Sequence, residues 1–179
     1  MADITSDAVL ILDDFTSQSG TSTYGTAWQG FTDRVMGGRS DMRAGISRES
    51  GDSFLRMAGV VSLENNGGFI QARLPLVAGS ETLDAREFTG VELEVRGREG
   101  SYFVHLRTSQ NRLPWSYYAA PVPVDTEWRT VRIPFDAFRS SSALRRDMPD
   151  LRRLQSIAIV AGTVAFEADI AVRHIALYR

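Results

Sequence analysis

The chain has 179 residues and a mass of 19.8 kDa, which fits a single domain (residues 1–179) with its own hydrophobic core. It has no cysteine and two histidines, which excludes disulfides, thiolate catalysis and zinc–thiolate sites and argues against a histidine-based metal centre. All 20 basic residues are arginine, so Schiff-base lysines and P-loop lysines are excluded as well. The net charge of −2 argues against nucleic acids and anionic membrane surfaces as partners.

The sequence predicts a protein that does not insert into membranes. No apolar run reaches the roughly 18 residues that would cross a bilayer. The first residues are acidic and lack the pattern of a signal or transit peptide, so we expect a cytoplasmic location.

Short apolar segments separated by turn residues predict strands rather than helices. We expect strands at residues 9–12, 28–36, 54–63, 69–76, 91–95, 102–106, 128–135, 157–160 and 166–177. In the last strand the apolar positions change parity between Val172 and Ile175, which predicts a bulge near Arg173–His174. One short helix is expected over residues 148–154. Roughly nine to eleven strands at spacings near ten residues indicate an all-β, antiparallel sandwich with little helix.

Two glycine-rich segments carry more polar residues than a turn needs. In the first, residues 28–41, a strand is expected to end at Val35–Met36, just before the Gly37–Gly38 pair. In the second, residues 60–73, Asn65-Asn66-Gly67-Gly68 is a strong turn signal. Each segment is either a hairpin turn, the first stapled by an Asp–Arg pair, or a polar recognition surface.

Both segments resemble, in order and spacing, motifs of the complex I intermediate-associated protein family (thirty-kilodalton type). The matching residues are Asp33-Arg34-Val35-Met36-Gly37-Gly38-x-Ser40, then Val61-Ser62-Leu63-Glu64-Asn65-Asn66-Gly67-Gly68-Phe69, and Arg73. The Trp128-x-x-Val-x-Ile-Pro-Phe segment and the ending at 166–175 resemble later strands of the family. The resemblance therefore covers about residues 13–178, and the turn at 98–100 departs from the family pattern.

The resemblance implies a galactose-binding-like jelly roll and a bacterial member of the family. It also implies a non-catalytic protein-binding domain that assists assembly of respiratory complex I (NADH:ubiquinone oxidoreductase), with intermediates of that complex as partners. Arginine would bind carboxylates of the client, and the amides would bind its backbone. The candidate surface comprises Asp33, Arg34, Met36, Gly37, Gly38, Ser40, Glu64, Asn65, Asn66, Gly67, Gly68 and Arg73.

A carbohydrate- or small-ligand-binding module is the alternative. Trp115 and Tyr117, on one face of an expected strand, would stack on sugar rings, while Arg107, Gln110 and Asn111 would bind hydroxyls. The other interpretation is that these aromatic side chains fill the core. Tyr118 points to the opposite face of the expected strand.

Catalysis, a cofactor and a metal are not expected. No acid–base pair, nucleophile elbow or phosphate loop is present in the sequence. A structural calcium ion bound by Asp13, Asp14 and Asp169 is the alternative considered for the acidic residues. The arginines at positions 145, 146, 152 and 153 form either a solvated helix face or a docking patch for an acidic partner.

Overall fold

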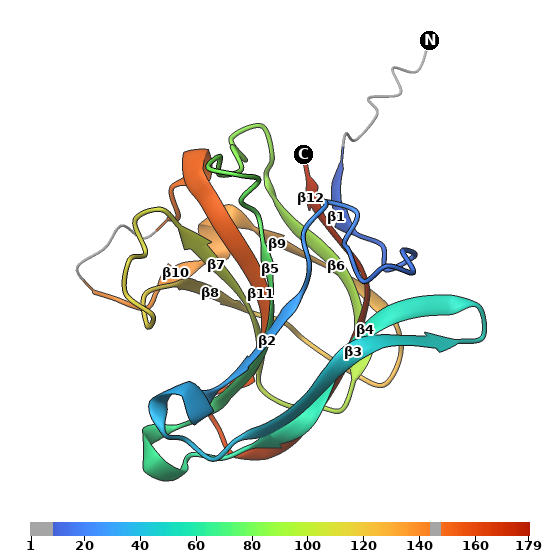
Figure 1. Ribbon diagram of the computed structural model, residues 1–179, viewed down its shortest axis with the longest axis vertical. Coiled ribbons are helices and arrows are strands. Elements are labelled where there is room, and N and C mark those ends of the chain that lie inside the picture. The colour runs from blue at the N-terminus through green and yellow to red at the C-terminus, as the bar shows by residue number, and fades with distance from the viewer. Residues whose placement is uncertain (1–8, 144–147) are drawn as a thin grey trace.

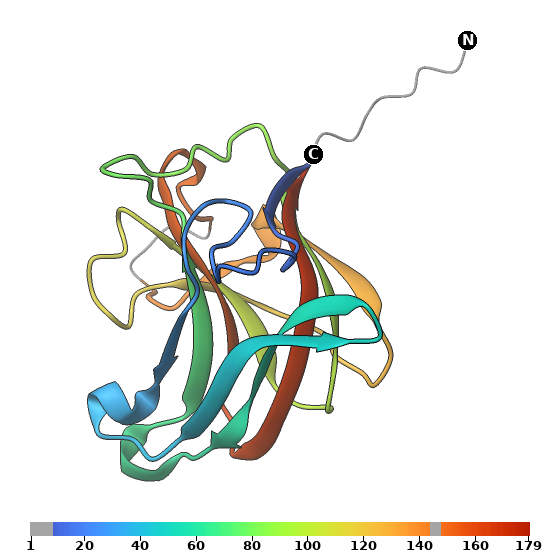
Figure 2. The same ribbon diagram turned by 45° about the vertical axis from the view of Figure 1, so that its right-hand side comes forward.

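In the computed structural model, which describes residues 9–143 and 148–179, the chain forms two antiparallel sheets that face each other (Figures 1 and 2). The first sheet consists of β1 (Leu10–Asp13), β3 (Asp41–Glu49), β4 (Asp52–Val61), β6 (Gly90–Gly97), β9 (Arg129–Pro134) and β12 (Phe166–Tyr178). Its strand order is β3-β4-β12-β6-β9, and β1 pairs with the last part of β12.

The second sheet has the strand order β10-β8-β7-β11-β5-β2. Its strands are β2 (Gln29–Thr32), β5 (Phe69–Pro75), β7 (Tyr102–Thr108), β8 (Tyr118–Pro121), β10 (Arg139–Ser140) and β11 (Leu154–Gly162). Four short 3₁₀ helices join the strands within the described residues: η1 (Asp33–Met36), η2 (Glu64–Asn66), η3 (Phe135–Ala137) and η4 (Leu151–Arg153).

The core lies between the sheets, because alternate side chains of each strand point inward. The second sheet contributes the buried residues Ile70, Leu74, Tyr102, Val104, Leu106, Ile157 and Ile159. The first sheet contributes Leu55, Met57, Val91, Leu93, Val95, Ile170 and Val172. The remaining side chains of β5, β7 and β11 consequently point to the outer face of the second sheet.

The predicted all-β antiparallel sandwich is confirmed, and so is the bulge in the last strand. The register of β12 against β6 shifts between Val172 and His174. The described residues contain twelve strands; β3 and β10 were not expected, and β8 begins just after the residues of the strand expected around Trp115 and Tyr117. The helix expected over residues 148–154 is wrong: η4 is one 3₁₀ turn and β11 already begins at Leu154. In the part of the chain that the structure describes, no helix is long and apolar enough to span a membrane.

The strand expected over residues 28–36 ends earlier, at Thr32. The Thr32 hydroxyl accepts a hydrogen bond of 3.2 Å from the backbone N–H of Arg34 and so starts the 3₁₀ helix η1. The helix ends at Gly37, whose φ of 86° is the left-handed conformation that glycine adopts without strain.

Neither glycine-rich segment is a hairpin turn, which corrects the simpler interpretation of both. The first connects β2 to β3 and the second connects β4 to β5, and each connection passes from one sheet to the other. The short coils η1 (blue) and η2 (green) lie side by side at the lower end of the molecule in both views (Figures 1 and 2). The two motifs therefore form one structural unit.

Candidate functional site

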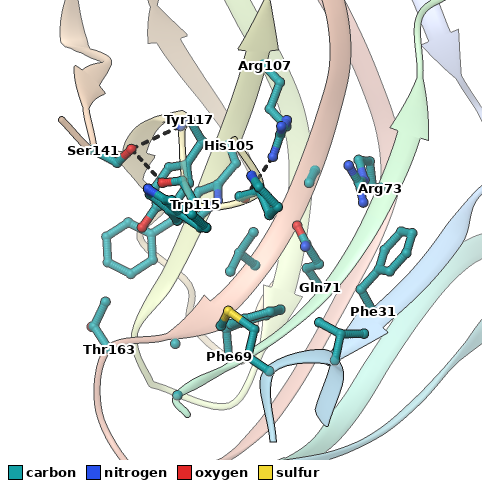
Figure 3. A pocket seen from close by; sticks show the side chains of 18 of the residues that line it. Phe31, Phe69, Gln71, Arg73, His105, Arg107, Trp115, Tyr117, Ser141 and Thr163 are labelled. Atoms are coloured by element: carbon teal, nitrogen blue, oxygen red, sulfur yellow. Dashed lines mark hydrogen bonds between the residues drawn. The ribbon is translucent and has the colours of Figure 1, made fainter. Parts of the chain in front are cut away.

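The outer face of the second sheet is hollowed into an open groove with a volume of about 770 Å³ (Figure 3). The central strand β11 forms its floor, and the outward residues of that strand have short side chains: Ser156, Ala158, Val160 and Gly162. The neighbouring strands β5 and β7 carry longer outward side chains, which form two walls. The hollow thus results from a strand of short side chains between two strands of long ones.

The strand register places the walls opposite each other. Arg73 of β5 and His105 of β7 are both paired with Ala158 of β11. In the next outward row, Gln71 and Phe103 flank the floor in the same way. Strands lie about 4.8 Å apart, so the walls are about 10 Å apart, wide enough for one extended chain.

The β7 wall is aromatic. His105 stacks on Tyr117 with 4.0 Å between ring centroids and 11° between the planes. Burial, and secondarily the charge of Arg107, lower the pKa of His105 to about 3, so the ring is neutral at pH 7. Trp115 lies further along this wall and is 63% exposed. Aromatic area of this size beside a hollow is typical of a binding surface.

The structure separates the aromatic residues considered for the alternative ligand platform. Trp115 and Tyr117 do line the groove, whereas Tyr118 is buried in the core. They precede β8 rather than sharing a face of it, because that strand begins only at Tyr118. The core interpretation therefore holds for Tyr118 alone.

Arg107 fixes the loop that carries Trp115. Its guanidinium donates hydrogen bonds of 2.8 to 3.0 Å to the carbonyl oxygens of Asn111, Leu113 and Pro114. We expected Arg107 to bind sugar hydroxyls, but both terminal nitrogens of its guanidinium are used within the loop. Arg107 therefore positions the loop.

The same loop is fixed at two further points. The buried Asn111 amide donates to the Ser116 hydroxyl at 2.8 Å and accepts from the Thr108 backbone N–H at 2.8 Å. The Ser141 hydroxyl donates to the Trp115 carbonyl oxygen at 2.9 Å (Figure 3). Asn111 is consequently not available to a ligand, which corrects its predicted role.

Arg73 is the charged residue of the opposite wall (Figure 3). Its guanidinium carbon lies 4.2 Å from the centroid of the Phe31 ring, a cation–π contact. Its Nε is buried and has no hydrogen-bond partner within residues 9–143 and 148–179. Burial lowers the pKa of Arg73, and no described carboxylate offsets that effect.

The two outer faces of the sandwich differ in how their charges are arranged. On the first sheet, four arginines are paired with carboxylates at 2.5 to 2.7 Å: Arg56 with Asp169, Arg96 with Glu49, Arg132 with Glu92, and Arg173 with Glu94. The described lining of the groove contains Arg73, Arg107 and Arg112 and no aspartate or glutamate. The groove is therefore positively charged, while the opposite face is largely neutralised.

Asp33 joins the two glycine-rich motifs at one end of the groove. Its fully buried carboxylate accepts hydrogen bonds from the Ser40 hydroxyl, the Ser40 N–H (2.9 Å) and the Gly68 N–H (2.6 Å). Burial alone would raise the pKa of Asp33, but these hydrogen bonds outweigh it and lower the pKa. Asp33 and Ser40, expected on the binding surface, are instead an internal brace.

Gly38 and Gly67 make room for that carboxylate. A Cβ atom at either position would overlap the Asp33 side chain. Both glycines were expected on the candidate binding surface. The structure gives both a structural role, because they enclose a buried acid.

The other motif residues divide between solvent and groove. Arg34 donates to the Ser40 carbonyl oxygen at 2.9 Å, and the exposed Glu64 pairs with Arg39 at 3.1 Å. Asn65 is exposed. The end of the groove is lined by Val35, Met36, Leu63, Asn66, Gly67 and Gly68. The motif surface and the alternative ligand platform are therefore two parts of one groove.

The acidic residues considered for calcium are engaged elsewhere. Asp13 accepts a hydrogen bond of 2.8 Å from the Trp28 indole, and Asp169 is paired with Arg56. Asp14 accepts from the Thr16 hydroxyl at 2.6 Å. Residues 9–143 and 148–179 contain no group of three or more side chains that could hold a metal ion.

The arginine cluster is only partly described. Arg152 and Arg153 are exposed on η4, and positions 145 and 146 lie outside the described residues. Whether the cluster is a docking patch therefore stays a prediction.

Sequence reasoning missed much of the groove. Phe31, Gln71 and Phe103 line it, although none of them was singled out, and Phe69 lines it although it was quoted only as part of the second motif. A signal was present in residues 154–162, where the alternate residues that point away from the core have short side chains. Such a strand between strands of long side chains predicts a hollow.

The fold is similar to that of solved carbohydrate-binding modules. A family 11 module of a cellulosomal cellulase from Clostridium thermocellum aligns with a TM-score of 0.73 and 15% identity, covering 97% of this chain and 95% of that chain. A family 11 module from Clostridium thermocellum in complex with a beta-1,3-1,4-mixed-linked tetrasaccharide gives 0.69 and 15%, covering 94% of each chain. A family 30 module gives 0.64 and 15%, covering 96% and 87%. At these identities the similarity concerns the fold.

The family follows from the sequence. No curated protein sequence matches this chain. Residues 14–169 match the family described as Complex I intermediate-associated protein 30. The matched span includes both glycine-rich motifs and most of the strands. This match confirms the resemblance found in the sequence, and the chain belongs to the Complex I intermediate-associated protein 30 (CIA30) family.

Proposed function

We propose that this protein is a non-catalytic binding protein that holds a segment of a partner protein in the groove. The observation that carries the proposal is the exposed Trp115 on a hydrogen-bonded loop, at the wall of a groove lined by aromatic and arginine side chains. A preformed site loses little conformational entropy when it binds. The family description supports a protein partner, and we propose an assembly intermediate of respiratory complex I.

The groove offers three kinds of contact to an extended polypeptide. The rings of Trp115 and Tyr117 would pack on apolar side chains. The amides of Gln71 and Asn66 would pair with backbone groups of the partner. The Asp33 brace would keep the end of the groove in place before the partner arrives.

The composition of the groove supports binding rather than catalysis. Its described lining has no carboxylate for acid–base chemistry. The low pKa of His105 keeps its ring neutral at pH 7, and its face is covered by Tyr117. With a pKa of about 3, His105 is a weak base at pH 7, so it would serve as part of a ring surface.

A carbohydrate is the second candidate ligand, favoured by the fold of the similar modules and by the exposed Trp115. Sugar hydroxyls both donate and accept hydrogen bonds, so sugar sites benefit from carboxylates and amides. Arginines are donors only, and they are the charged groups of this groove. The balance of donors and acceptors therefore favours a ligand rich in acceptors.

Affinity co-purification tests the proposal. Tagged wild type, a Trp115→Ala/Tyr117→Ala variant and an Arg48→Ala control would be incubated with lysate and gently solubilised membranes from the source organism. Arg48 is an exposed residue of β3, on the other sheet. We expect complex I subunits with wild type and the control but not with the groove variant. Equal recovery by all three proteins, or no protein partner with any, would refute the proposal.

A further inference from the structure

Arg73 lacks the carboxylate partner that four arginines of the opposite sheet have. Its guanidinium is half-buried against Phe31, its Nε is buried without a hydrogen-bond acceptor, and no aspartate or glutamate lies in the described lining. An arginine that is desolvated but unpaired is unfavourable on its own. A carboxylate is its natural complement, because two carboxylate oxygens match the guanidinium N–H groups in a bidentate pair.

We infer that the groove recognises an acidic polypeptide segment, in which a side-chain carboxylate of the partner binds the guanidinium of Arg73 and a neighbouring apolar residue packs on the Trp115 wall. This inference deepens the proposed function and rests on it. It specifies the chemistry of the partner rather than its name.

The positions of the arginines support a single anchor. The terminal nitrogens of Arg107 are bonded to loop carbonyls, so it adds positive charge to the groove without offering these donors to a ligand. Burial, and secondarily the nearby positive charge of Arg73, lower the pKa of Arg107. Arg112 is exposed at the rim and adds to the positive potential. Arg73 is therefore the arginine best placed to bind the carboxylate directly.

The distance between the walls sets the spacing in the ligand. Arg73 and His105 lie in one row across β11, about 10 Å apart by strand spacing. In an extended chain, residues three positions apart are separated by roughly 10 Å. An acidic residue and an aromatic or aliphatic residue two to four positions apart would therefore reach both walls.

The end of the groove favours a polypeptide over an acidic sugar. Val35, Met36 and Leu63 are exposed there by 72%, 54% and 50%. Flexible aliphatic side chains adapt to the apolar residues of a protein partner, whereas sugar rings are bound by flat aromatic faces. A segment with an acidic residue between apolar residues is complementary to the whole length of the groove.

Selection from a displayed library of random dodecapeptides tests the inference. Wild type, Arg73→Gln, Trp115→Ala and an Arg48→Gln control would be the baits, with circular dichroism verifying that each is folded. We expect wild type and the control to select peptides in which an acidic residue lies within four positions of an aromatic or aliphatic residue. A selected peptide should bind Arg73→Gln at least tenfold more weakly, and its glutamine analogue should bind both proteins equally.

Each other outcome overturns the inference in a distinguishable way. If the selected peptides show no acidic preference, or if Arg73→Gln selects the same peptides as wild type, Arg73 does not bind the carboxylate. The proposed function would remain intact. If wild type selects no peptide better than Trp115→Ala does, the groove does not bind polypeptides and the proposed function fails as well. Binding of oligogalacturonate that depends on Arg73, without any selected peptide, would assign the groove to acidic glycans.

Discussion

The buried carboxylate of Asp33 accepts a hydrogen bond of 2.6 Å from the backbone N–H of Gly68, which lies 35 residues further along the chain. This bond ties together the two connections that cross between the sheets. Both connections also contribute to the end of the groove, through Met36 and Asn66. Asp33 therefore links the stability of the fold to the shape of the site.

Asp33→Ala should destabilise the protein by about 3 kcal/mol or more, because it leaves several buried donors without an acceptor. Urea unfolding followed by tryptophan fluorescence would measure the loss. Glu64→Ala is the matched control, since its ion pair with Arg39 is exposed and should contribute less than about 1 kcal/mol. Equal, small effects of the two substitutions would contradict the bracing role.

Gly38→Ala should cost about 1–3 kcal/mol, because the added Cβ would overlap the Asp33 side chain. Gly45→Ala provides the comparison: no atom lies within 4 Å of its Cβ position and its φ is not left-handed. That change should be neutral or slightly stabilising. Thermal unfolding of both variants tests the difference, and a Gly38→Ala protein as stable as wild type would show that the carboxylate is not enclosed as described.

Sequence reasoning captured the strands that have a buried apolar face and missed the exposed strand β3. Residues 91–95 alternate cleanly because one face lies in the core. In contrast, β3 at the sheet edge is exposed along most of its length, so it has no apolar alternation to detect. The motif turns were misread because sequence does not reveal whether a turn returns to its own sheet or crosses to the other.

Arg107→Ala should loosen the loop that carries Trp115, because three carbonyl oxygens lose their donor. We expect faster backbone hydrogen exchange over residues 109–117 and a partner affinity at least several-fold weaker. Arg107→Lys should rescue little, since one ammonium group cannot reproduce the guanidinium fork. Unchanged exchange in that loop would indicate that Arg107 does not hold it.

Stability should fall in mild acid partly because of His105. Its pKa is about 3 in the folded protein against 6.5 ordinarily, so between these values the unfolded chain binds more protons and unfolding is favoured as pH falls. Between pH 7 and 5, wild type should lose up to about 2 kcal/mol more than His105→Gln does. Asp33, whose pKa is lowered, contributes only below about pH 4. Urea unfolding at both pH values tests this, and parallel losses would contradict a His105 that stays neutral in the folded protein.

The candidate site could be predicted only in fragments. The glycine motifs and the Trp115 segment are recognisable in sequence, but their meeting in one groove depends on the register of β5, β11 and β7. The roles of Asp33 and Asn111 were also beyond sequence reasoning. Polar residues that brace a fold and polar residues that bind a ligand have the same composition, and only burial and hydrogen-bond partners separate them.

Site-specific photo-crosslinking would show whether the groove contacts a partner protein. Trp115 would be replaced by p-benzoylphenylalanine in the source organism, with the same replacement at Arg48 on the other sheet as the control. We expect a crosslinked protein partner, a complex I subunit, from position 115 and none from position 48. No crosslinked protein from position 115, or the same products from both positions, would contradict the claim that the groove holds a partner protein.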